Sequence, residues 1–142
     1  MRLSLLKPRV ALMSQFADVQ GAAQLSIAVE RGQFSDAAYL YLKARTAASG
    51  TLVNRVQQRV THRIVIAHWN RVLTDASGDA AVDAASDVSD ALIAHLLGWT
   101  PSDRYAPLEY VSGTVLRFIP TVGLLWADEF TTSYLIRDQP TP

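Results

Sequence analysis

The sequence predicts an α+β fold in which an antiparallel-rich or mixed sheet carries two helices on one face and ends in a long C-terminal β-hairpin. Three observations predict it. Residues 79–97 have a helical period, residues 57–69 alternate as a strand does, and two long strand-like segments, 108–119 and 124–137, flank a turn at residues 120–123. No period of about 20–50 residues recurs and no linker divides the chain, so we expect a single domain over residues 1–142 with a short tail at 138–142.

The composition of the chain excludes several classes of protein. Its 142 residues can close one hydrophobic core, and 49% apolar with 18% charged residues is ordinary for a globular chain. Cysteine is absent, which excludes disulfides, thiolate metal sites and a cysteine nucleophile. No apolar run approaches the roughly 18–20 residues that cross a bilayer, and Lys7, Pro8 and Arg9 interrupt any signal-peptide core. We expect a cytosolic chain with no membrane partner.

Two segments open the chain. An N-terminal amphipathic helix is predicted from about Pro8 to Val19, with Val10, Met13 and Phe16 at helical spacing and Pro8 in the first turn. Residues 24–29 alternate in character and are predicted as a short strand or a structured loop.

A strand and an arm follow. Residues 37–44 predict a strand with Tyr39 and Tyr41 on one face. Residues 43–56 are rich in small and basic side chains around Ser49 and Gly50, which predicts a long flexible arm or hairpin tip.

The strand over residues 57–69 changes character along its length. Val60, Ile64 and Ile66 share one face with His62, and the opposite face is polar at first but turns apolar at Val65. One end is therefore predicted half-exposed and the other buried on both faces.

The helix over residues 79–97 has one apolar stripe and one acidic face. The stripe comprises Ala81, Ala85, Val88, Leu92 and Leu96; the opposite face carries Asp79, Asp83, Asp87 and Asp90. Gly98 suits the position after the helix, and Pro101 prevents its continuation. Trp99 is then expected to pack where the chain turns back into the sheet.

The C-terminal hairpin contains two informative pairs. Ser112 and Gly113 inside the first strand predict a bulge or a close-packing site. Asp128 and Glu129 are adjacent on the second strand and so point to opposite faces, which excludes a simple carboxylate pair.

No motif for catalysis, cofactor binding or metal binding was found. His62 and His68 stand roughly 20 Å apart along one strand, too far for one metal ion, and His95 is isolated. Neither a nucleophile elbow nor a phosphate-binding glycine loop occurs. We therefore predict that the protein is not an enzyme.

The charges are unevenly distributed although the net charge is zero. Residues 1–71 hold ten of the thirteen Lys/Arg and three of the thirteen Asp/Glu, and residues 72–142 hold the rest, giving roughly +7 and −7. If this asymmetry persists on the surface, it suits head-to-tail association, because the two sides of a heterologous interface differ. The residues predicted to lie at an interface are Lys43, Arg45, Arg55, Gln57, Arg59, Arg63 and Trp99.

Several phrases of the sequence occur in a familiar order. They are VQGAAQLSIAV (19–29), DAAYLYL (36–42), VQQRVTHRIVIAHWN (56–70), ALIAHLLGWTP (91–101), PLEYVSGTVLRF (107–118) and LLWADEFTTSYLIR (124–137). Together they cover nearly the whole chain, and the pattern resembles the tail terminator and minor tail proteins of tailed bacteriophages, the Mu-type and lambda-type group.

The resemblance implies a specific role. Proteins of this group are structural virion proteins that form a hexameric ring on the head-proximal end of the tail tube. Tail assembly takes place in the host cytoplasm. The ring stops tube polymerisation and offers a surface to the neck or connector protein, and DNA passes through its lumen. No cofactor is implied. Two alternatives remain: a neck or head-completion protein of the same particle, and a small cytosolic enzyme or nucleic-acid-binding module that uses the basic segment 45–63.

Overall fold

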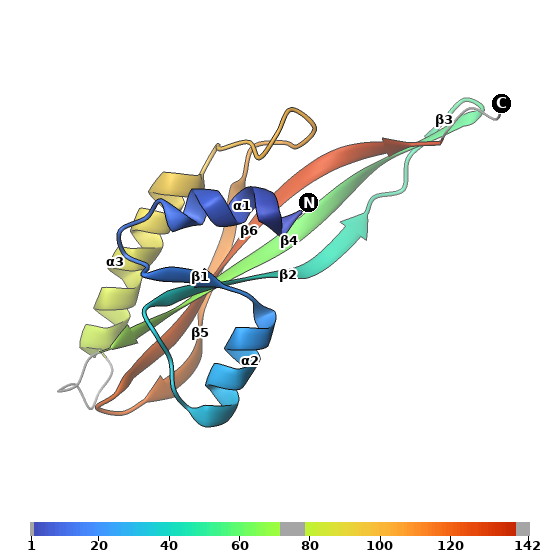
Figure 1. Ribbon diagram of the computed structural model, residues 1–142. Helices are drawn as coiled ribbons and strands as arrows, with labels where there is room; N and C mark the ends of the chain where they lie inside the picture. Colours follow the sequence, from blue (N-terminus) through green and yellow to red (C-terminus); the bar gives the residue numbers. More distant parts are fainter. Residues whose placement is uncertain (1, 72–78, 139–142) are drawn as a thin grey trace.

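The computed structural model describes residues 2–71 and 79–138, and it has the predicted α+β class (Figure 1). The described helices are α1 (Leu3–Ala11), α2 (Ala22–Arg31) and α3 (Asp79–Leu96). The strands are β1 (Asp18–Gln20), β2 (Ala37–Ala47), β3 (Thr51–Leu52), β4 (Arg55–Arg71), β5 (Glu109–Ile119) and β6 (Gly123–Arg137). Apart from Asp138, the predicted tail lies outside the described residues.

The sheet is mixed. Its strands run in the order β1-β2-β4-β6-β5, and the short β3 pairs with β4 beside this path. Only β1 and β2 are parallel; the remaining pairs are antiparallel. The predicted C-terminal hairpin is confirmed as β5 and β6, with Thr121 at φ 61° in its turn.

The two predicted helices cover one face of the sheet, as expected. Leu6 and Val10 of α1 and Leu92 of α3 are fully buried in one cluster with Leu40 of β2 and Phe130 of β6. The helices also contact each other directly. Arg9 Nη2 donates to the His95 carbonyl (2.9 Å), and His95 Nε2 donates to the Arg9 carbonyl (2.6 Å).

The predicted bounds of the first helix were wrong. It begins five residues earlier and ends at Ala11, because its buried stripe, Leu6 and Val10, starts before Pro8. Pro8 therefore lies inside the helix and not in its first turn. Val19, expected at the end of the helix, pairs with Ala38 as the centre of β1.

The segment predicted as a strand or loop at 24–29 is instead part of α2, on the opposite face of the sheet. The Gly21 N–H donates to Gln24 Oε1 (3.0 Å) at its start, and Gly32 ends it in the left-handed conformation at φ 65°. Leu25 and Ala28, three residues apart, face the second buried cluster with Tyr39 and Trp69. The short alternation of polar and apolar residues could not be distinguished from a helix whose apolar stripe is narrow.

The predicted gradient of burial along β4 is confirmed. Residues 55–59 are exposed or half-buried, whereas residues 64–70 are all buried. Ile64 and Ile66 contact the cluster under α1 and α3, while Val65, Ala67 and Trp69 contact the cluster under α2.

The end of α3 also follows the prediction. Gly98 has φ 78°, its N–H donates to the Leu108 carbonyl (2.9 Å), and the Leu108 N–H donates to the Trp99 carbonyl (2.9 Å). Trp99 packs against the α1/α3 cluster, so the corner is held by backbone bonds and an aromatic anchor. One member of the predicted stripe is corrected: Ser89 is buried beside the sheet, whereas Val88 is half-buried.

Candidate functional site

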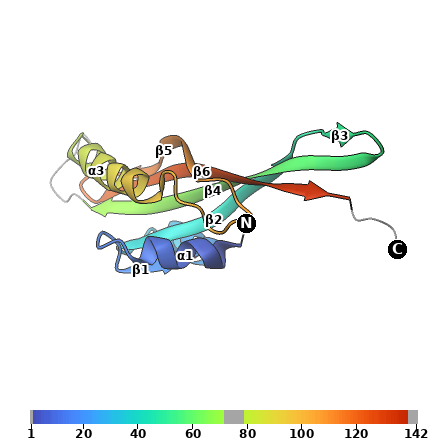
Figure 2. The same cartoon turned by 90° about the horizontal axis from the view of Figure 1, so that it is seen from above.

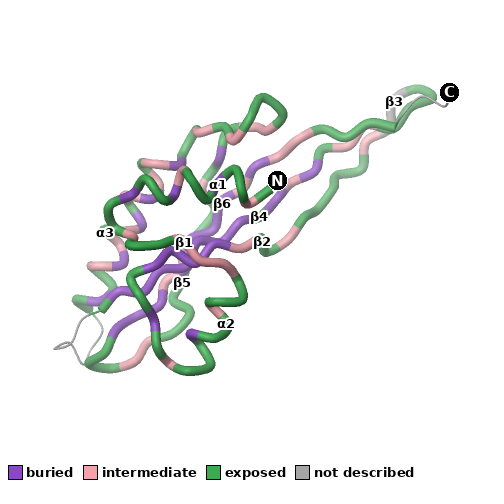
Figure 3. The backbone as a smooth tube through the Cα atoms, viewed as in Figure 1, coloured by how far each residue is buried: buried purple, intermediate pink, exposed green. Residues whose placement is uncertain are grey.

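The most distinctive feature of the molecule is a three-stranded arm. We define the arm as residues 43–63 and 131–137, the outer parts of β2, β4 and β6 together with β3. Figures 1 and 2 show these strand ends extending beyond all three helices, and Figure 3 shows that the burial of the sheet fades along them. The segment 43–56, predicted as a flexible arm, is thus mostly strand and continues the sheet as a hairpin.

Two of the predicted interface residues meet on one acid. Lys43 Nζ lies 2.8 Å from Glu129 Oε1, and Arg63 Nη1 lies 2.9 Å from Glu129 Oε2. Hydrogen bonding from Lys43 is the main reason why the pKa of Glu129 lies below its usual value; burial opposes it, and the charges of Lys43 and Arg63 assist it. This trio connects β2, β4 and β6 where the arm leaves the body.

Arg45 lies on the opposite face of the arm from Lys43. The register between β2 and β4 shifts between Leu42 and Ala44, and beyond the shift Arg45 pairs with His62. A bulge of this kind inserts one residue and changes which side chains share a face. The sequence alternation alone would have placed Lys43 and Arg45 together.

The other arm candidates follow β4 toward the tip. Arg59 Nη1 donates to Ser133 Oγ (3.1 Å), and Arg55 is exposed opposite Leu52. The Gln57 N–H donates to the Gly50 carbonyl (3.3 Å), and a side chain at Gly50 would collide with the Gln57 backbone. Glycine is therefore required for the tip to fold back this closely.

Trp99 lies outside the arm. It belongs to the corner after α3, where the guanidinium of Arg9 lies 5.6 Å from its ring centroid. The structure thus brings six of the seven predicted residues onto the arm and leaves Trp99 in the body.

Three acids of the second half of the chain lie together on another surface. Asp83, Asp87 and Asp90 are exposed on the outer side of α3, whereas five of the ten cations of the first half (Lys43, Arg45, Arg55, Arg59 and Arg63) lie on the arm. Part of the charge asymmetry of the sequence therefore persists as a basic arm and an acidic helix face.

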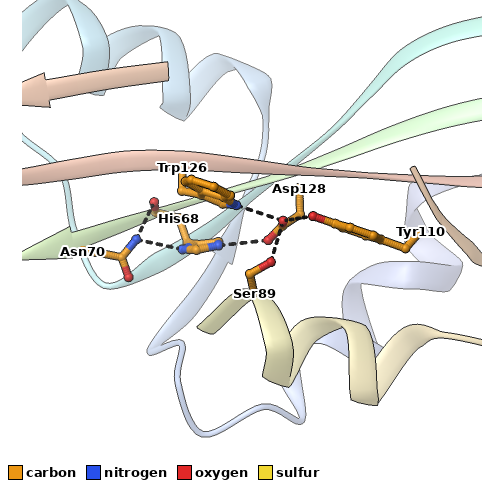
Figure 4. Close-up of polar contacts among 6 residues, drawn as sticks. All are labelled: His68, Asn70, Ser89, Tyr110, Trp126 and Asp128. Atoms are coloured by element: carbon orange, nitrogen blue, oxygen red, sulfur yellow. Dashed lines mark hydrogen bonds and ion pairs between the residues drawn. The ribbon is translucent and has the colours of Figure 1, made fainter. Parts of the chain in front are cut away.

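A buried polar network was missed by the sequence reasoning. Asp128 is fully buried and accepts hydrogen bonds from four side chains on α3, β4, β5 and β6 (Figure 4). The donors and distances are Ser89 Oγ (2.8 Å), Tyr110 OH (2.9 Å), Trp126 Nε1 (2.9 Å) and His68 Nε2 (3.1 Å). The signal was present in the sequence, since Asp128 stands between Trp126 and Phe130 on the apolar face of its strand.

The electrostatics of the network favour an ionised carboxylate. Burial by itself raises the pKa of Asp128, but the four hydrogen bonds together outweigh burial and lower it below its usual value. Burial and the neighbouring carboxylate raise the pKa of Tyr110. Asn70 Nδ2 donates to His68 Nδ1 (3.0 Å), a pattern that assigns the ring proton to Nε2.

The network links α3 to strands β4, β5 and β6 through hydrogen bonds to one carboxylate. Ser89 donates to Asp128 and not to His68, so the arrangement differs from the serine–histidine pair of a nucleophilic triad. Across residues 2–71 and 79–138, no group of three or more His, Asp or Glu side chains could hold a metal ion. In the same part of the chain, no helix is long and apolar enough to cross a membrane.

Comparison with known proteins identifies a family. The family model described as phage tail terminator protein matches residues 3–141 of the chain. A search of the curated proteins finds no match.

Proposed function

Because this chain belongs to the phage tail terminator protein family, we propose that it forms a ring that caps the phage tail tube, ends tube polymerisation and provides the head-side joining surface. The family is structural, which agrees with a role as a virion protein of the bacteriophage tail. The ring, the capping step and the joining surface are the parts that we add.

The observation that supports a ring is the projecting arm. Its exposed strands carry Arg45, Arg55 and Arg59 away from the body, while the acidic face of α3 belongs to the body. Two unlike surfaces on one subunit suit a heterologous contact, and heterologous contacts close into rings when the rotation permits. By family resemblance we propose six subunits.

The partners follow from the position of such a ring. One rim would contact the tail tube protein and the other the neck or connector protein, and DNA would be the only nucleic acid, passing through the lumen. The basic arm provides salt-sensitive contacts to an acidic neighbour, either the next subunit or the rim of the tube.

Capping can be tested by measuring the length of growing tail tubes. Tail tube protein is polymerised in vitro, the purified chain is added in excess, and tube length is followed by electron microscopy. We expect growth to stop, with a ring on one end of each tube. Tubes that keep elongating at the uninhibited rate would overturn the proposal. Rings found only on the portal of filled heads would instead identify a head-completion protein.

A further inference from the structure

The outer end of β6 has one open edge. β5 begins at Glu109, and the last backbone bond on that side joins the Ala106 N–H to the Ser133 carbonyl (2.8 Å). On the other side, the Asp138 N–H donates to the Val56 carbonyl (3.0 Å). Because hydrogen bonding alternates between the two sides of an antiparallel strand, Leu135 and Arg137 direct their N–H and C=O groups to the open side. Within the described residues, no backbone group pairs with them there.

This edge borders a hollow, and neither a proline nor a bulge blocks it. A cavity of about 480 Å³ is lined by Arg104, Leu135, Ile136 and Arg137. Leu135 is 41% exposed and Ile136 36% exposed. Exposed edges in natural sheets are normally blocked by proline, a bulge or charged side chains. Residues 134–137 have neither a proline nor an irregular register with β4, and the charge beside this edge comes from Arg104 and Arg137.

β2 has a matching open edge on the other side of the arm. β1 pairs only with residues 37–39, so the outer edge of β2 beyond them has no strand neighbour in the described chain. The Ala48 N–H donates to the Arg59 carbonyl (3.0 Å), and Ala44 to Ala47 pair regularly with β4. By the same alternation, Arg45 and Ala47 direct their backbone groups outward.

We propose that the β6 edge of one arm pairs with the β2 edge of the arm in a second copy of this chain. Both strands run outward from the body, because each is antiparallel to β4. Copies related by a rotation about an axis along the arms would therefore pair β6 with β2 in parallel. This inference rests on the proposed ring and names the contact that holds it.

One register satisfies both edges. If Leu135 lies opposite Thr46 of the next copy, its N–H reaches the Arg45 carbonyl and its C=O receives the Ala47 N–H. Leu135 and Thr46 also share a face, because Leu135 pairs with Arg59 and Thr46 pairs with Thr61 across β4. Ile136 then lies beside Ala47, and Arg137 beside Ala48.

Edge use favours this head-to-tail pairing over a two-fold dimer. A dimer joined through two β2 edges leaves both β6 edges open, and one joined through two β6 edges leaves both β2 edges open. Repeated β6-to-β2 pairing uses every open edge of the arms, closing them into a barrel in which no edge remains.

Proline substitutions can block each edge separately. Leu135→Pro and Arg45→Pro each remove one outward N–H that β4 does not use, so folding should persist, as checked by circular dichroism. Leu135→Ala is the matched control, since it shortens the same side chain and keeps the N–H. We measure mass by light scattering, both free and with tail tubes present. We expect rings for the wild-type chain and for Leu135→Ala, and 15.6 kDa monomers for each proline variant.

Mixing the two proline variants tests the direction of pairing. One intact β6 edge and one intact β2 edge remain in the mixture, so we expect a dimer of about twice 15.6 kDa that grows no further. A mixture that stays monomeric, a proline variant that still forms rings, or either variant forming dimers alone overturns the inference. A wild-type chain that never forms a ring, even on tubes, overturns the proposed function as well.

Discussion

Ser89 Oγ lies 2.8 Å from Asp128 Oδ1, and this hydrogen bond joins the middle of α3 to the centre of the sheet. Both residues are buried. Asp128 also connects β4 through His68 and β5 through Tyr110. The helix is therefore positioned by a specific polar contact as well as by its apolar stripe, and several predictions of stability depend on it.

Replacing Ser89 with alanine should lower the free energy of unfolding by about 1–2 kcal/mol, because one donor to a buried carboxylate is lost. Ser86→Ala, three residues earlier on the same helix and outside the network, makes the same change in helix propensity. Urea unfolding of both variants checks this. Equal stability in the two would mean that the Ser89 hydroxyl contributes nothing to the network.

Stability should depend on pH through Asp128 and Glu129. Both carboxyl groups have a pKa below the usual value in the folded state. Their contribution is therefore complete above the unfolded pKa, about 4, and is lost as pH falls through the lower folded pKa. Unfolding measured from pH 2 to 7 should show this acid loss, and Asp128→Asn should flatten it while destabilising the protein at pH 7. An unchanged acid slope in Asp128→Asn would contradict the assignment.

The orientation of α3 predicts opposite results on its two faces. Leu92→Ala removes a fully buried side chain and should cost about 2–5 kcal/mol of unfolding free energy. Asp83→Ala and Asp87→Ala lie on the exposed face and should change it by less than about 0.5 kcal/mol. Thermal and urea unfolding measure both. The reverse order of effects would show that the helix faces the other way.

Gly113 should tolerate no side chain. A Cβ there would lie 2.6 Å from both Trp126 Cζ2 and the Tyr110 hydroxyl, and 2.9 Å from Asp128 Oδ1. Gly113→Ala should therefore destabilise by about 1–3 kcal/mol through overpacking. Gly98→Ala is a useful comparison, because its Cβ meets nothing within 4 Å and only the φ of 78° is strained. Loss of the tryptophan fluorescence signature in Gly113→Ala alone would identify the clash.

Charge reversal on the arm should separate folding from assembly. Arg45→Glu with Arg55→Glu changes two exposed residues, so the melting temperature should stay near that of the wild type while incorporation into tails falls. Lys7→Glu with Arg71→Glu makes the same change in net charge at exposed positions off the arm and should leave incorporation unaffected. Full incorporation of the arm variant at physiological salt would remove arm charge from the mechanism.

The sequence alone determined the elements whose pattern is long and regular. α3, β4, β5 and β6 each extend over eleven residues or more, so their apolar period and their Gly98 and Pro120 boundaries were readable without neighbours. The same patterns indicated that the end of the strand near Trp69 is buried on both faces, and the order of phrases indicated the phage tail terminator family, which the family match confirms.

Only the tertiary structure decided the short elements and the contacts between distant ones. α1 and α2 are nine and ten residues long. Helices this short depend on packing against the sheet for their stability, so their sequence period alone did not define them. The three-residue strand β1 likewise depends on its pairing with β2. The bulge that separates Arg45 from Lys43, and the Asp128 network drawn from four elements, depend on register and on packing across 39 to 60 residues of chain. Local sequence does not specify these contacts, because each of the residues could form hydrogen bonds or pack with many other residues of the chain.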